Sequence, residues 1–219
     1  MNTKIYPDSG VELSAFIAKN YDKLMNIMSF GLYRSFINKA IKEMDIKPRS
    51  SILDLGCGTG RNANLMAKYI GESGQITGLD ISEDMERQFV NKFKGRSNIN
   101  FLNQRIDQPF NLKKQFDIVF ISFVIHGFPH EIRKTVIQNA FTHLKPGGVF
   151  YILDFAEFDM DKMPVHHQFI FKSIECKYAF DYIKRDWKRI LKEANFDNFK
   201  ERFYVKKYVR LLKAVKSEK

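Results

Sequence analysis

The chain has 219 residues, enough for one domain with a sizeable core. Hydrophobic residues make up 44% of it, which excludes an intrinsically disordered chain. Two cysteines are too few for a disulfide framework or a cysteine-rich metal site, and we assign no metal. The longest nearly unbroken apolar stretch is residues 118–125, interrupted by Ser122, and it is too short to span a bilayer. Residues 1–10 lack the apolar core of a secretion signal. We therefore expect a cytoplasmic protein.

The net charge of +11 is concentrated at the end of the chain. Residues 182–219 hold 13 Lys and Arg against 5 Asp and Glu. Such a basic segment attracts nucleic acid, an anionic membrane surface or an acidic substrate. It is equally well read as a solvated basic face, and the pattern alone leaves both interpretations open.

Residues 11–45 are predicted to be helical. From residue 33 the apolar positions follow a helical stripe, and they are Tyr33, Phe36, Ile37, Ala40, Ile41 and Met44. Lys47 precedes a proline and so disfavours helical backbone angles, which ends this segment. Because residues 24–28 are apolar on several sides, we expect residues 1–47 to form a helical lid over a neighbouring site.

A short apolar strand then runs into a glycine-rich loop within residues 51–60. The glycines follow a GxGxG spacing, and a helical pattern begins at Arg61. Glycine permits unusual backbone angles and close approach of a ligand, so the loop predicts a nucleotide-like ligand at the helix start. The spacing is not that of dinucleotide binders, so the ligand need not carry a pyrophosphate. Asp54, just before the first glycines, could meet a positive group of that ligand.

Asp80 ends the next apolar strand, at residues 75–79, twenty residues after Gly60. An acid at this place can accept hydrogen bonds from two ribose hydroxyls. Ser82 is a plausible N-cap for the following helix, with acidic residues in its first turn. Ile81 is placed to pack on an adenine face, or else belongs to the core.

Further strands and helices follow in alternation. Strands are predicted at residues 99–103, 116–121 and 148–155, and at 199–204 and 208–215, while helices are predicted at 130–143 and 183–194. Asn195 is placed to end the last helix. Residues 156–180 interrupt the alternation with a polar stretch and a helix-like stretch from His166 onward, and we expect this insertion to shape a substrate pocket.

The glycine loop and Asp80 resemble motif I and the second-strand acid of class I methyltransferases that depend on S-adenosylmethionine (SAM). Phe116-Asp117 and Pro146-Gly147-Gly148 match the same fold. Residues 18–34 resemble the N-terminal signature of the ubiquinone/menaquinone C-methyltransferase (UbiE-like, methyltransferase type 11) family. The resemblance implies one α/β domain over residues 1–219. Its Rossmann-like, doubly wound sheet would have seven mostly parallel strands with an antiparallel C-terminal strand.

The resemblance also implies SAM as the cofactor, S-adenosylhomocysteine as its product, and a set of cofactor contacts. These contacts are Tyr21, Asp54, Gly56, Cys57, Gly58, Asp80, Ile81, Met85, Arg105, Ile106 and Ser122. One position departs from the pattern, because Arg105 stands where relatives often place an acid that accepts from the adenine amino group. Arginine cannot accept a hydrogen bond, so Asp107 or backbone carbonyls would take that role.

Residues 122–129 follow the fourth predicted strand, where ligands of open α/β sheets bind. His126 in this loop is a candidate general base near neutral pH, or a structural histidine satisfied by the backbone. Members of the quinone family usually carry Arg-Asn where this chain has His126-Gly127, which is a second departure.

The acceptor is predicted to be a small molecule, either a quinol precursor or another aromatic. Alternatives are a phospholipid amine taken from an anionic membrane, an RNA or protein substrate, and SAM binding without catalysis. An Asn/Asp-Pro-Pro-Tyr/Phe motif after the fourth strand, which would hold a flipped base, is lacking. Nucleic acid is therefore the less favoured partner, and the sequence leaves the oligomeric state open.

Overall fold

The computed structural model describes residues 32–218. Tyr21 and most of the expected lid, residues 1–47, lie outside this part of the chain. The α-helices described are α2 (Leu32–Glu43), α3 (Arg61–Ile70), α4 (Glu83–Lys92), α5 (His130–His143), α6 (Val165–Ile174), α7 (Lys177–Tyr182) and α8 (Trp187–Glu193). Short 3-10 helices are η1 (Ile125–Gly127), η2 (Met160–Lys162) and η3 (Val205–Lys207). None of the helices in residues 32–218 is long and apolar enough to cross a membrane.

The described strands form one sheet in the order β3-β2-β1-β4-β5-β7-β6. They are β1 (Ser51–Leu55), β2 (Gln75–Asp80), β3 (Ile99–Asn103), β4 (Phe116–Ser122), β5 (Leu144–Phe155), β6 (Phe196–Tyr204) and β7 (Val209–Lys216). Strands β1 to β5 pair in parallel, while β7 is antiparallel to both of its neighbours. This topology confirms the predicted doubly wound fold with an antiparallel strand near its C-terminus. Whether residues 1–219 form a single domain stays a prediction.

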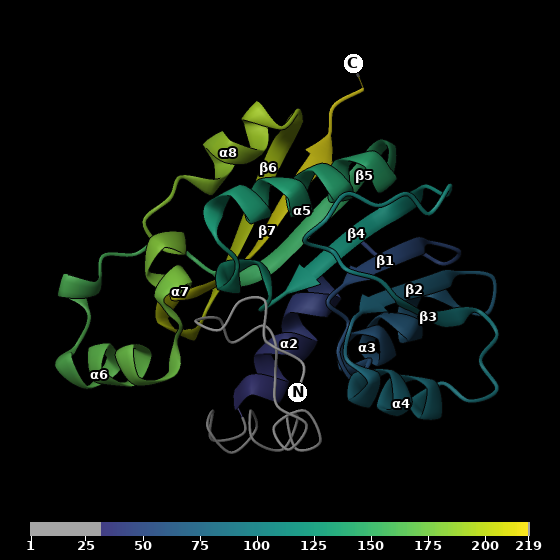
Figure 1. Ribbon diagram of the computed structural model, residues 1–219, viewed down its shortest axis with the longest axis horizontal. Helices are drawn as coiled ribbons and strands as arrows, with labels where there is room; N and C mark the ends of the chain where they lie inside the picture. Colours follow the sequence, from purple (N-terminus) through teal and green to yellow (C-terminus); the bar gives the residue numbers. More distant parts are fainter. Residues whose placement is uncertain (1–31, 219) are drawn as a thin grey trace.

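Two helical layers cover the sheet, as Figure 1 shows. Side chains alternate between the faces of a strand, so Ile52 packs in the layer of α2, α3 and α4, while Leu53 and Leu55 pack in the layer of α5, α7 and α8. Both clusters consist of fully or nearly fully buried apolar side chains. The sheet is therefore buried on both faces, and its ligand-binding edge lies where the parallel strands end.

Local signals explain where several helices begin and end. The Ser82 side chain accepts a hydrogen bond from the backbone N–H of Met85 and caps α4, as predicted. Asn195 directly follows Ala194, the C-cap of α8, and its φ of 63° is the left-handed conformation that commonly follows the end of a helix. The expected stripe on α2 is buried at Ile37, Ala40 and Ile41.

Strand β5 begins at Leu144, four residues earlier than predicted. Leu144 pairs with Phe116, and the next pair joins Val149 to Ile118, so the Pro146-Gly147-Gly148 turn bulges out between them. Strand β6 likewise begins at Phe196 rather than 199. Within residues 156–180, η2, α6 and α7 form the expected insertion, and α6 lies away from the sheet in Figure 1.

Candidate functional site

The glycine loop joins β1 to α3 in backbone conformations that favour glycine. Gly56, Gly58 and Gly60 have φ values of 73°, 52° and 74°. A Cβ at Gly56 would lie 2.7 Å from a methyl group of Val124, so this glycine is required for close packing. A Cβ at Gly58 would meet nothing nearer than the Met85 sulfur at 3.9 Å. The loop is thus tight at its start and leaves an open cradle at its middle.

Asp80 is fixed at the end of β2 by three backbone N–H groups. Its Oδ2 accepts from Gly58 at 2.9 Å, and its Oδ1 accepts from Ile81 and Ser82 at 2.8 and 3.1 Å. Burial raises the pKa of Asp80, although these hydrogen bonds oppose the rise. The carboxylate is therefore fixed in position, and Oδ2, which accepts one hydrogen bond, retains acceptor capacity for a ribose hydroxyl.

Asp54 is a buried carboxylate with an unsatisfied oxygen. It is 1% exposed, and its Oδ2 has no hydrogen-bond partner among the described residues. Burial, followed by repulsion from Asp80, raises the pKa of Asp54 to about 8. The hydroxyl of Ser122, at the end of β4, is likewise buried without a partner. Such groups are costly unless a ligand satisfies them, and the ammonium and sulfonium of SAM carry the complementary charge.

A pocket with an empty volume of about 470 Å³ opens beside Asp80. Its lining is Gly56, Leu79, Asp80, Ile81, Gln104, Arg105, Ile106, Asp107, Val124 and Phe128. Ile81 is 40% exposed, so an apolar face is available on the pocket wall. The ribose acceptor and this apolar face adjoin, which fits the adenosine part of SAM.

Arg105 and Asp107 form an ion pair at this pocket. Arg105 donates from Nε to Asp107 Oδ1 at 3.0 Å and also from Nη2 to Oδ2. Asp107 is 7% exposed, so the acid that the sequence suggested as a substitute for position 105 does lie at the pocket, but Arg105 binds both of its oxygens. The adenine contacts of Arg105 and Ile106 stay predictions.

The remaining predicted contacts divide between the loop and the core. Met85 is buried on α4 beneath Gly58. The Cys57 sulfur packs on Gly78 of β2, where a Cβ would lie 2.7 Å from it. Burial raises the pKa of the Cys57 thiol well above its usual range, so this thiol is not a nucleophile. Among residues 32–218, no cluster of His, Cys, Asp or Glu is suited to hold a metal ion.

His126, in η1 after β4, is held between two carboxylates. Its Nδ1 lies 2.8 Å from Asp154 Oδ1, and its Nε2 lies 3.5 Å from Glu175 Oε2. Burial by itself would lower the pKa of His126, but the charge and hydrogen bond of Asp154, together with the charge of Glu175, raise it to about 9. The ring therefore keeps its proton at neutral pH. This argues against the predicted base role, because a base must be unprotonated.

Aromatic rings surround His126. The His126 ring centroid lies 5.1 Å from that of Phe155 and 6.4 Å from that of Tyr182. The ring centroid of Phe155 lies 6.2 Å from that of Phe123 and 5.1 Å from that of Phe171. His126, whose side chain is 14% exposed, thus lies in an aromatic cluster at the C-terminal ends of β4 and β5.

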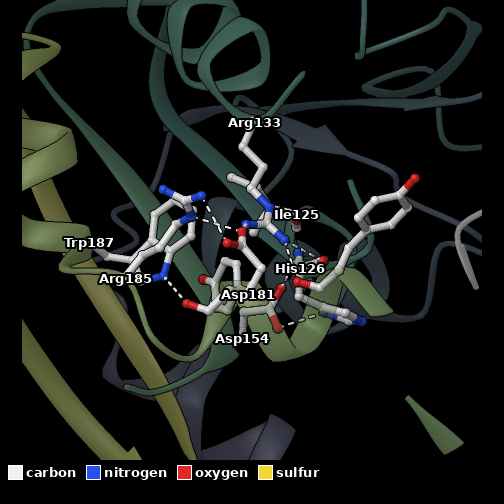
Figure 2. A network of polar contacts seen from close by, with 9 residues as sticks. Ile125, His126, Arg133, Asp154, Asp181, Arg185 and Trp187 are labelled. Carbon is white, nitrogen blue, oxygen red and sulfur yellow. Dashed lines mark hydrogen bonds and ion pairs between the residues drawn. The ribbon is translucent and has the colours of Figure 1, made fainter. Parts of the chain in front are cut away.

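A buried arginine that we did not predict supports this loop. Arg133 of α5 is 0% exposed, and it donates to the backbone oxygens of Ile125 and His126 at 3.2 and 2.9 Å. It also pairs with Asp181 at 2.7 Å, which Arg185 binds as well. Figure 2 shows the Arg133 side chain pointing toward these groups.

A signal for Arg133 was present in the sequence. This position precedes three apolar residues of the same helix, Val136, Ile137 and Ala140, at spacings of three, four and seven, so it shares their buried face. A cation on such a face must be paired.

Comparison with known proteins adds the family. The family model for the ubiE/COQ5 methyltransferase family matches residues 10–179. A demethylmenaquinone methyltransferase of Staphylococcus carnosus is 33% identical over 159 residues, which cover 72% of this chain and 65% of the relative. The enzyme of that name from Desulfitobacterium hafniense is 33% identical over 144 residues, covering 64% and 56%. The matched segment thus spans less than two thirds of the length of either relative.

Solved structures share the fold. A SAM-dependent methyltransferase from Aquifex aeolicus superposes with a TM-score of 0.65 at 20% identity, covering 93% of this chain and 99% of that one. The N-methyltransferase NodS from Bradyrhizobium japonicum, solved with S-adenosylhomocysteine, gives a TM-score of 0.60 at 16% identity, covering 85% and 87%. These likenesses concern the fold, whereas the family model matches well over half of the sequence. The chain belongs to the ubiE/COQ5 methyltransferase family.

Proposed function

We propose that this protein transfers a methyl group from SAM to an aromatic small molecule, namely a quinol precursor of the demethylmenaquinol type. The observation that carries the proposal is His126, held as a cation among aromatic rings at the sheet edge where Asp54 and Asp80 also lie. The names of the relatives supply the acceptor class. A cytoplasmic location and peripheral contact with an anionic membrane belong to the same proposal.

On the cofactor side, the residues bind and orient. Asp80 would accept from the two ribose hydroxyls, Ile81 would pack on the adenine, and Asp54 would neutralise positive charge near the glycine loop. Gly58 provides the open cradle, and Ser122 has a hydroxyl in need of a partner. When bound, the cofactor would supply an electrophilic methyl group, so these residues contribute chiefly by positioning it.

On the acceptor side, a carbon that gains a methyl group must lose a proton. Ionisation of the adjacent quinol hydroxyl makes that carbon nucleophilic. Asp154 holds the His126 ring through Nδ1, and the Nε2–H, which is 3.5 Å from Glu175 and not hydrogen-bonded to it, would donate to the resulting oxyanion. Burial raises the pKa of Glu175, so this carboxylate would accept the proton of the quinol hydroxyl. After methyl transfer the carbon loses its own proton and the oxygen regains one, so the quinol is restored and one proton is released overall.

The test is methyl transfer from labelled SAM to reduced demethylmenaquinone, followed by chromatography and mass spectrometry. The expected product is heavier by one CH₂ unit. Asp80→Ala should abolish transfer, whereas Asp84→Ala, which removes a carboxylate on the adjoining helix, should retain it. A parallel reaction contains phosphatidylethanolamine. Label in that lipid would favour the phospholipid amine reading, and SAM binding without transfer to either acceptor would leave a non-catalytic binder.

A further inference from the structure

Two apolar side chains on α6 are exposed far beyond the rest. Val165 is 81% exposed and Phe169 is 72% exposed, while the next large apolar side chain among the described residues, Val90, reaches 56%. Val165 and Phe169 lie four residues apart, so they occupy one side of the helix, and Lys172 extends the same stripe. Isolated exposed apolar residues are ordinary, but an aligned pair at this exposure indicates a surface that a partner covers.

The opposite side of α6 is well packed. Phe171 is 8% exposed and contacts Phe155, Phe158 and Phe180. The position of the helix is therefore fixed by its inner side, and Val165 and Phe169 are directed outward by that packing. Val165 and Phe169 are therefore exposed although α6 itself packs on the core.

The 3-10 helix η3 adjoins α6 and adds to the same surface. The ring of His167 on α6 lies 5.7 Å from that of Tyr208, which directly follows η3. Val205 is 49% exposed, and the two lysines after it are exposed as well. All three residues of η3 have positive φ values of 48°, 52° and 71°. This costly backbone turns one apolar and two basic side chains outward at the tip of the β6–β7 hairpin.

The charges of the basic C-terminal segment divide into two groups. Five of its cations are engaged within the protein, namely Arg185, Lys188, Arg189, Arg210 and Lys216. Lys206 and Lys207, with Lys172 on α6, are exposed and form no ion pair with any residue in the described part of the chain. Lys184, Lys192, Lys200 and Arg202 are likewise exposed without an ion pair in this part of the chain, whereas Lys172, Lys206 and Lys207 are the ones that lie on α6 and η3 beside the exposed apolar residues.

We propose that Val165, Phe169 and Lys172 of α6, together with Val205, Lys206 and Lys207 of η3, form a docking surface for an anionic lipid bilayer. Apolar side chains flanked by lysines match the boundary between acyl chains and anionic headgroups. The sequence suggested the whole basic end as the contact, and this surface is the part where lysines adjoin strongly exposed apolar side chains.

The same helix connects the surface to the site. Glu175, the residue that caps the C-terminal end of α6, lies 3.5 Å from His126. Docking through α6 would therefore hold the acceptor side of the site close to the bilayer. The value of this arrangement for catalysis rests on the proposed lipid-soluble acceptor, whereas the docking surface itself rests only on its own residues.

Co-sedimentation with vesicles tests the docking surface. The full chain is mixed with vesicles of phosphatidylcholine alone or with about one third phosphatidylglycerol, at low and at high salt. We expect binding to the anionic vesicles at low salt only. Lys206→Asn with Lys207→Asn, a pair that tolerates the left-handed backbone, should weaken binding by about fivefold per lysine. Val165→Ser with Phe169→Ser should also weaken it, whereas Val90→Ser on α4 should not.

The same variants separate this proposal from the enzymatic one. The α6 double variant should keep its turnover of a water-soluble short-chain quinol while its vesicle binding falls. Wild-type protein that stays in solution at low salt, or variants that pellet as wild type does, would overturn the docking surface. Loss of a dimer in the α6 variant, measured by analytical ultracentrifugation, would show instead that a second copy covers this surface. Absence of methyl transfer with intact vesicle binding would count only against the proposed function.

Discussion

The charge state of His126 can be measured directly. Its pKa of about 9, against an ordinary value of 6.5, corresponds to about 3 kcal/mol in favour of the imidazolium. Asp154 provides the shorter contact and Glu175 the longer one. We therefore expect Asp154→Asn to lower the pKa of His126 by more than Glu175→Gln does, each within about 1 to 3 units.

The assay is NMR titration of the histidine ring protons between pH 5 and pH 10. Three other histidines, His130, His143 and His167, have pKa values that burial lowers, so the His126 signal should titrate well above theirs. The variant His126→Asn identifies the signal by its loss. Glu193→Gln, an exposed carboxylate on α8, serves as the matched control and should leave the titration unchanged.

The raised pKa of His126 also makes the stability of the folded protein depend on pH. Because folding raises the pKa of His126, its stabilising contribution is complete below pH 6.5 and is lost as the pH rises through about 9. Chemical denaturation at pH 6 and pH 9.5 should show a smaller difference in Glu175→Gln than in the wild-type protein. A wild-type midpoint near 6.5 in the NMR titration would show that Asp154 and Glu175 do not keep His126 protonated at neutral pH.

Binding of SAM at pH 7 should release a proton, because Asp54, with its pKa raised to about 8, is protonated in the free protein and ionised beside a cation. Affinity should then rise with pH up to about 8, and equal calorimetric heats in buffers of different ionisation enthalpy would contradict this. Gly56→Ala should cost about 1 to 3 kcal/mol and weaken SAM binding, because its positive φ and the contact with Val124 exclude a Cβ; an unchanged melting temperature would speak against it. Arg133→Met should cost about 3 to 5 kcal/mol in denaturant unfolding, because three backbone carbonyls and the Asp181 carboxylate lose their donor; a loss under 1 kcal/mol would mean that water replaces the guanidinium.

The geometry of the candidate cofactor site could largely be predicted from the sequence, because the features that build it are local. The left-handed glycines of the loop come directly after a strand, and Asp80 ends the next one, so parallel pairing of β1 and β2 brings them together. The first residues of strands β5 and β6 were not predicted correctly. Leu144 extends β5 because a bulge accommodates the turn, which no periodicity reveals.

The surroundings of Arg210 and His126 were harder to predict, because their contacts come from residues that are distant in sequence. Arg210 belongs to the basic C-terminal segment and reads as a surface residue. It is 2% exposed, because Glu157 and Glu201 enclose it from other elements. Glu175, likewise, reaches His126 only through the fold of the insertion. Burial of a charge depends on partners that single-sequence patterns do not identify.

Asp154 and Glu175 affect how the histidine at position 126, which departs from the family pattern, should be interpreted. The family resemblance implies an arginine there, a permanent cation, and a neutral histidine would lose that charge. Asp154 and Glu175 favour the protonated form of His126, so an N–H donor persists after β4 despite the different residue, while the two carboxylates offset the charge of the ring. The nearby Arg133 does not oppose this, because Asp181 pairs with its guanidinium and Arg133 contacts only the backbone oxygen of His126. The histidine is therefore no argument against a quinol acceptor, since its Nε2–H, which is not hydrogen-bonded to Glu175 at 3.5 Å, can donate to an oxyanion.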